Sequence, residues 1–96
     1  MDMESLMAQA EIMQKKISEA QDSLAQMHVK GISQNGAVVV GMTGKYDIES
    51  VVISDSVMSL GAKAVSDLAL SAFKDAKEKA DALIEKVMNS VTGDAE

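Results

Sequence analysis

Few side chains in this sequence could carry out acid–base or covalent chemistry. His28 is the only histidine, and there is no Cys. A zinc site or a catalytic triad needs several such groups, so we expect His28 to be a solvated or interface residue. Asp81 and Glu85 are four residues apart, which is typical of charges on a helix surface rather than of a catalytic dyad. The glycines match no phosphate-binding loop. The sequence therefore predicts a chain that is not an enzyme, with no metal site, cofactor or small-molecule substrate.

The lysines are the remaining candidates, because they could contact the phosphates of DNA. They occur as Lys15 and Lys16 near the N-terminus and, nearer the C-terminus, as Lys74, Lys77, Lys79 and Lys86. Most have Asp or Glu close by in sequence, which favours an ion-paired, solvated surface over a phosphate-binding stripe. The chain has nine Lys, no Arg and a net charge of −6, so its overall field repels a polyanion.

Two long helices would position these lysines. Apolar residues recur every three or four positions through Met3, Leu6, Ala10, Met13, Ile17, Ala20, Leu24 and Met27. This heptad spacing predicts a helix over residues 4–26, roughly 34 Å long. A second apolar stripe predicts a helix over residues 62–91, with Gly61 before it and Gly93 as its C-terminal signal.

Between the helices the period changes to two, and the segments MHVKGI, AVVVGMT and DIESVVIS predict three short strands. Asn35-Gly36 favours a hairpin turn and residues 44–47 a second one, so the strands should form an antiparallel meander. Alternation places one set of residues on a single inward face: Met27, Val29, Val38, Val40, Met42, Val51 and Ile53. Val39 and Val52 fall on the opposite face and suggest that it is covered too.

The expected fold is α+β, in the order α-β-β-β-α, as a single domain of 96 residues. A three-stranded sheet is too small to cover the stripes of two such long helices, so we expect a homodimer with projecting helices. The candidates for dimer or packing contacts are Leu6, Ala10, Met13, Ile17, Val39, Val52 and Phe73. The absence of Cys, of a secretory signal and of a long apolar run favours the cytoplasm and no membrane association.

Specific segments then carry a resemblance to a known family. The stretch LMAQAEIMQKKISEAQDSLAQMHVKG, the VVV strand, Gly44, the segment VVISDS and the segment DLALSAFKDAKEKA are similar to the YbaB/EbfC family over residues 6–80. The resemblance implies a nucleoid-associated protein that binds duplex DNA as a homodimer, with helices projecting like the arms of tweezers. It also implies that the arms face DNA, which makes Lys15, Lys16, Lys74, Lys77 and Lys79 the candidate contacts.

Two functions stay open at this point. The first is a DNA-binding, nucleoid-associated homodimer that contributes to nucleoid organisation or gene regulation; without Arg, its contacts should be salt-sensitive and largely non-specific. The alternative is an acidic protein-interaction scaffold that does not bind DNA, which the net charge of −6 favours.

Overall fold

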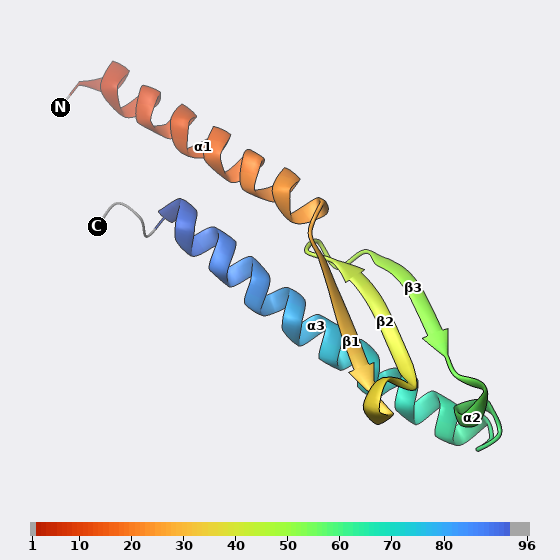
Figure 1. The fold of residues 1–96 in the computed structure, drawn as a ribbon. Coiled ribbons are helices and arrows are strands. Elements are labelled where there is room, and N and C mark those ends of the chain that lie inside the picture. The colour runs from red at the N-terminus through yellow and green to blue at the C-terminus, as the bar shows by residue number, and fades with distance from the viewer. Residues whose placement is uncertain (1, 93–96) are drawn as a thin grey trace.

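The structure is a computed structural model, and it describes residues 2–92 of the chain. A long helix, α1 (Met3–Ala25), leads into a sheet made of β1 (His28–Ser33), β2 (Val38–Thr43) and β3 (Ile48–Ile53). A short helix, α2 (Asp55–Met58), then precedes the long helix α3 (Ala62–Thr92). The sheet is an antiparallel meander in the order β1-β2-β3, and it lies at one end of a molecule of 67 × 22 × 17 Å (Figure 1).

Helix α1 begins at a capped end and makes little contact with the sheet. The Asp2 carboxylate accepts a hydrogen bond from the backbone N–H of Ser5 at 2.8 Å, as an N-cap side chain does. Of the α1 side chains, only Ala20 and Leu24 are buried. Most of the helix therefore projects beyond the sheet (Figure 1).

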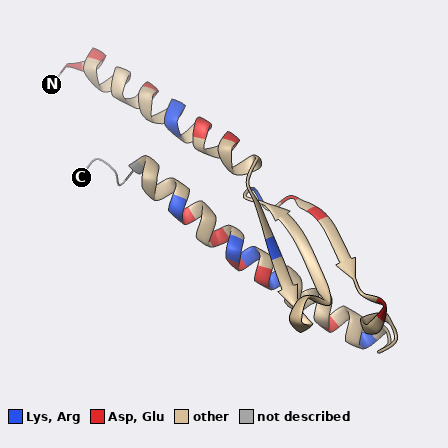
Figure 2. Ribbon diagram, viewed as in Figure 1, with Lys and Arg blue, Asp and Glu red and all other residues tan. Residues whose placement is uncertain are grey.

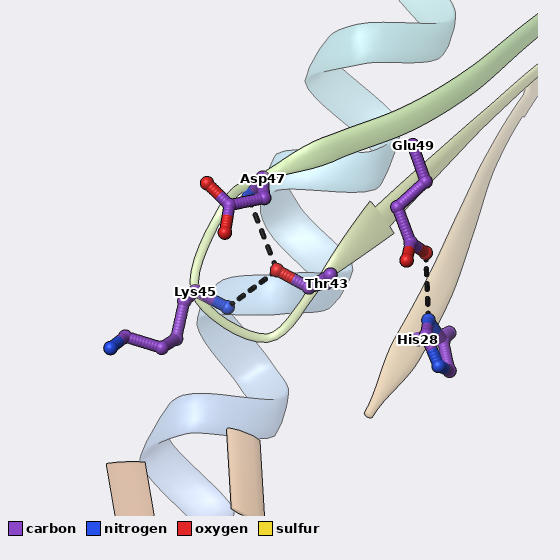
Figure 3. Close-up of polar contacts among 5 residues, drawn as sticks. All are labelled: His28, Thr43, Lys45, Asp47 and Glu49. Atoms are coloured by element: carbon purple, nitrogen blue, oxygen red, sulfur yellow. Dashed lines mark hydrogen bonds and ion pairs between the residues drawn. The ribbon is translucent and has the colours of Figure 1, made fainter. Parts of the chain in front are cut away.

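The two turns of the meander are short, and the first contains two residues that tolerate a positive φ. A single 3-10 turn, η1 (Gln34–Gly36), joins β1 to β2, with Asn35 at φ 55° and Gly36 at φ 96°. In the second turn the buried Thr43 hydroxyl accepts hydrogen bonds from the N–H groups of Lys45 and Asp47, each at 3.1 Å (Figure 3). Both connections are short, which fixes the register of the three strands.

The core lies between the sheet and α3. Ala72, Ala76 and Ala80 are fully buried in α3, and the inward residues Val38, Val40 and Met42 of β2 pack with them. The helix approaches β1 so closely that a Cβ atom on Gly31 would lie 2.0 Å from the backbone oxygen of Ala72. Small residues at both sides of this contact are therefore what allows the helix to sit on the sheet.

The base of α1 is attached to the second turn through backbone bonds. The N–H of Gly44 donates to the carbonyl oxygens of Leu24 and Met27, each at 3.0 Å. A Cβ atom on Gly44 would be 2.6 Å from that Leu24 oxygen, so glycine is required for the approach. The end of α1 is thereby held against the sheet while the rest of the helix is not.

The predicted α-β-β-β-α order and both long helices are confirmed, and the observed helix ends lie within one residue of the predicted ones. One detail differs. Val51 was expected to be covered on the inward face, but it is 44% exposed because α3 packs on β1 and β2 and leaves β3 uncovered. Val52 on the opposite face is 60% exposed in the single chain.

None of the described helices is long and apolar enough to cross a membrane. Gly93 lies outside the described residues.

Candidate nucleic-acid interface

Two helical arms, α1 and the C-terminal part of α3, run alongside each other away from the sheet (Figure 1). The groove between them has a volume of about 790 Å³. Its apolar lining comes from both helices: Met13, Ala20 and Met27 at the α1 side, and Leu83, Val87 and Val91 at the α3 side. Three charged side chains border it, namely Lys16, Glu19 and Lys86. The groove therefore carries two positive charges and one negative charge, in a chain whose net charge is −6.

Lys77 and Lys79 of α3 are held by carboxylates. The Lys77 ammonium lies 3.0 Å from the Asp81 carboxylate and 5.8 Å from the centre of the Tyr46 ring, and the Tyr46 hydroxyl donates to the same carboxylate. Lys79 lies 3.0 Å from Asp75. Positive and negative residues alternate along this part of α3 (Figure 2). Both lysines would have to leave these partners in order to bind a phosphate.

The pKa values of these groups follow from their hydrogen bonds. The Ile32 backbone N–H and then Lys79 hold the pKa of Asp75 below its usual value. The Tyr46 hydroxyl and then Lys77 lower the pKa of Asp81, while the same contacts with Asp81 raise the pKa values of Tyr46 and Lys77. All four groups are thus stabilised in their physiological charge states by contacts within α3 and by contacts of α3 with β1 and the second turn.

Lys74 has an acidic environment. It borders a second, shallow groove beside β1, together with Asp67, Asp75 and Glu78. Three carboxylates around one lysine repel a phosphate at this position. The sequence candidates on α3 are therefore either ion-paired or surrounded by negative charge.

Lys15 and Lys16 of α1 differ from the α3 lysines. No carboxylate among the described side chains lies within ion-pair distance of either, and the same holds for Lys86. The fold brings Lys16 and Lys86 to one groove from distant parts of the chain. Lys86 was one of the lysines that could contact DNA phosphates, but it was not among the candidate contacts that the family resemblance implies; its place next to Val87 on the apolar stripe of α3 was the sequence signal that it could lie near α1.

Comparison with known proteins decides the family. The model of the YbaB/EbfC DNA-binding family matches residues 1–95. The chain belongs to the YbaB/EbfC DNA-binding family. It is 42% identical to the nucleoid-associated protein bll8115 of Bradyrhizobium diazoefficiens over 93 residues, which cover 96% of this chain and 88% of that protein. It is also 42% identical to a nucleoid-associated protein of Francisella philomiragia over 80 residues, covering 83% of this chain and 72% of that one.

A solved structure shares the fold of this YbaB/EbfC chain. It is the crystal structure of the uncharacterized protein HP0035 of Helicobacter pylori, with a TM-score of 0.84 and 20% sequence identity. The match covers 94% of this chain and 96% of the other. The projecting helices therefore occur in another protein of the same architecture.

The remaining candidates of this family member fall into two groups. Leu6 and Met13 on α1 are 45% and 40% exposed, and Ala10 is exposed as well. Ile17, Val39 and Phe73 are half-buried, and Phe73 packs against the chain's own core.

The Nδ1 atom of His28 lies 2.7 Å from the Oε1 atom of Glu49, across the exposed face of the sheet (Figure 3). Among the described residues, no cluster of His, Asp and Glu could hold a metal ion.

Proposed function

We propose that this chain is a nucleoid-associated protein that binds duplex DNA as a homodimer, through phosphate contacts made by the lysines of its arms. The observation that carries the proposal is the convergence of Lys16 and Lys86 on one groove of a YbaB/EbfC chain. Lys15 is the third contact, since it too has no ion-pair partner among the described side chains. Lys74, Lys77 and Lys79 are secondary contacts, because acids surround or hold them.

The net charge of −6 sets the conditions under which such binding operates. At physiological salt the Debye length is about 8 Å, so a phosphate senses mainly the charges near its contact. The groove is locally positive there, with two lysines against Glu19. Binding is then local, moderate and steeply weakened by salt, and without Arg it reads base sequence poorly.

Fluorescence anisotropy with a labelled duplex, at several salt concentrations, tests the proposal. The affinity of the wild type should fall linearly on a double-logarithmic scale as salt rises. Lys16→Ala and Lys86→Ala should each weaken binding to all sequences alike, and each should reduce that slope by about 1, because each removes one lysine–phosphate pair. Lys63→Ala is the matched control, because Lys63 lies at the start of α3 and pairs with Asp67 at 3.5 Å. No detectable binding at low salt would refute DNA binding by this protein.

An acidic protein-interaction scaffold is the second candidate, and the exposed apolar seam of α1 favours it. Met3, Leu6 and Met13 of this seam are 72%, 45% and 40% exposed. A protein that co-purifies in a fixed ratio after nuclease treatment, together with no DNA binding in the titration, would establish the scaffold instead. Loss of that protein after nuclease treatment would favour DNA as the shared ligand.

A further inference from the structure

The groove between the two arms has an apolar floor that a DNA contact does not use. Met13 and Met27 line it at the α1 side, and Leu83, Val87 and Val91 line it at the α3 side. Met13 is 40% exposed, and the other four side chains are half-buried. Most protein–DNA contacts go to phosphates and sugars, which are polar. DNA therefore matches the lysines at the rim and leaves the floor without an apolar partner.

The rim of this groove is positive although the chain is acidic. Lys16 borders the groove from α1, and Lys86 borders it from α3. Neither lysine has a carboxylate within ion-pair distance among the described side chains. Glu19 is the one acidic residue of the lining, so positive charge is in excess there, in a chain whose net charge is −6. The rim thus attracts an anionic group locally.

The dimensions of the groove fit a small, elongated ligand. Its volume of about 790 Å³ lies within the range of about 300–1,000 Å³ that is usual for small-molecule sites. Along the α1 side its lining runs from Met13 to Met27, which is roughly 20 Å at 1.5 Å per residue. These two methionines have flexible side chains that adapt to apolar ligands. An extended acyl chain can therefore lie along the floor.

A helix is too wide for the same space. An α-helix with its side chains is about 10 Å across, so 20 Å of helix occupies roughly 1,600 Å³. This is about twice the volume of the groove. The arm of a second copy, or a helical segment of another protein, would consequently stand out of the groove and leave part of its apolar face in water. A single acyl chain has no such excess.

We propose that this groove binds one long-chain fatty acid, with its acyl chain along the floor and its carboxylate between the ammonium groups of Lys16 and Lys86. The binding is non-covalent. Apolar burial of the chain supplies most of the affinity, about fourfold for each methylene group buried. The lysines fix the orientation by charge-assisted hydrogen bonds. The site is additional to the proposed DNA contact and does not depend on it.

Isothermal titration calorimetry of the full chain with dodecanoate, kept below its critical micelle concentration, tests the site. The wild type should bind one dodecanoate per chain. Decanoate, which is shorter by two methylene groups, should bind about tenfold more weakly. Dodecyltrimethylammonium has a chain of the same length and a head group of opposite charge. It should also bind at least about tenfold more weakly than dodecanoate, although the net charge of −6 favours a cation.

Substitutions in the groove locate the ligand. Lys16→Ala and Lys86→Ala should each weaken dodecanoate binding about fivefold, because each removes one charged donor near the surface. Val87→Asp should abolish binding, since it places a carboxylate in the apolar floor. Lys63→Ala is the matched control, because Lys63 pairs with Asp67 at 3.5 Å and lies outside the groove. Circular dichroism checks that each variant is folded; the two lysine variants decide the test if Val87→Asp is not.

NMR of the methionine methyl groups measures the same contact independently. The signals of Met13 and Met27 should move when dodecanoate is added, because both side chains line the groove. Met58 is 57% exposed and lies outside the groove, so its signal should stay in place. An equal movement of the Met58 signal would show adsorption over the whole surface and would overturn the site.

The outcomes separate this site from DNA binding, because the calorimetric titration contains no DNA. Failure of dodecanoate to bind, together with salt-sensitive duplex binding in the anisotropy titration, would overturn the fatty-acid site and leave the proposed function standing. Dodecanoate binding without duplex binding would do the reverse. Equal affinities for dodecanoate and dodecyltrimethylammonium, or unchanged affinities in both lysine variants, would also overturn the site.

Discussion

The base of the molecule and its arms are made of similar residues but are packed very differently. In the base, where α3 backs the sheet, Val38, Val40 and Ala76 are completely buried. In the arms, Met3 and Leu6 of α1 are 72% and 45% exposed although they belong to the same kind of apolar stripe. An amphipathic stripe therefore predicts a helix without predicting what covers it.

The difference assigns separate roles to the two regions. The base has enough buried apolar surface to fold and to hold the ends of both helices, through the Gly44 bonds to α1 and the alanines of α3. The arms contribute little to that core, and most side chains of α1 are exposed in the single chain. Substitutions should consequently affect folding in the base and binding in the arms.

The largest effect on stability is expected at the closest contact between α3 and the sheet. Gly31→Val would place side-chain atoms where the Ala72 oxygen already lies 2.0 Å from an added Cβ, which forces α3 away from β1. We expect a loss of about 3 kcal/mol in unfolding free energy, measured by urea denaturation at fixed protein concentration. Gly36→Ala is the control: its φ of 96° is strained but nothing lies within 4 Å, so about 1 kcal/mol should be lost. Equal losses of unfolding free energy in the two variants would show that the contact between Gly31 and α3 is not tight.

The next prediction compares the two ends of α1 itself. Leu24 is 3% exposed at the base, whereas Met7 is 60% exposed on the arm. Leu24→Ala should cost about 3 kcal/mol of unfolding free energy, and Met7→Ala should change it by less than about 0.5 kcal/mol. Urea denaturation of both variants measures this. A large effect of Met7→Ala would mean that the arm is buried in the folded protein, as in a dimer joined through its arms.

Local patterns in the sequence were enough to predict most of the secondary structure. The heptad spacing of α1, the change to a period of two and the Asn35-Gly36 turn all depend on residues close together in the chain. The exposure of Val51 could not be predicted in the same way. It alternates like a buried strand residue, and only the position of α3 over β1 and β2 determines that it is uncovered.

In the candidate site, too, contacts between residues close in sequence could be predicted, and contacts between distant parts of the chain could not. The pairs Lys77–Asp81 and Asp75–Lys79 have the i,i+4 spacing of helix ion pairs, so the sequence indicated that these lysines are neutralised. The meeting of Lys16 and Lys86 depends on how two distant helices lie against each other. The bond from Lys79 to the Lys30 carbonyl is likewise a tertiary contact that no local pattern contains.

A smaller effect is expected at β1, where the Asp75 carboxylate accepts a hydrogen bond from the Ile32 N–H at 2.8 Å. The pKa of Asp75 is lowered in the folded chain, so its contribution to stability is present above the unfolded pKa of about 4 and is lost as the pH falls through the folded pKa. Asp75→Ala should lower the melting temperature at pH 7 and make it less sensitive to acid. Thermal melting followed by circular dichroism, from neutral to acidic pH, measures both effects.

Two control variants identify the cause of that effect. Asp75→Asn keeps an acceptor for the Ile32 N–H, so it should retain more of the melting temperature at pH 7 than Asp75→Ala does, while losing the acid sensitivity. Asp67→Ala removes an exposed carboxylate whose partner, Lys63, lies 3.5 Å away, and it should change neither property. An unchanged melting temperature for Asp75→Ala at pH 7 would show that the hydrogen bond from Ile32 does not stabilise the fold.

The smallest expected effect concerns the contact between the second turn and the start of the α3 arm. Tyr46→Phe removes the hydroxyl that donates to Asp81, which is the main reason that the Asp81 pKa is lowered. The Asp81 pKa, followed by NMR, should rise toward its usual value, and by more than in Lys77→Met, because Lys77 is the lesser cause. An equal or larger rise in Lys77→Met would make the ion pair the main contact.

The same hydroxyl gives this contact a dependence on alkaline pH. The Tyr46 pKa is raised in the folded chain, so the stabilising bond is fully present below the unfolded pKa of about 10 and is lost as the pH rises through the folded pKa. The stability difference between wild type and Tyr46→Phe, measured by urea denaturation, should accordingly shrink at alkaline pH. DNA binding at pH 7 through Lys16 and Lys86 should stay unchanged in this variant, because the hydroxyl lies outside their groove.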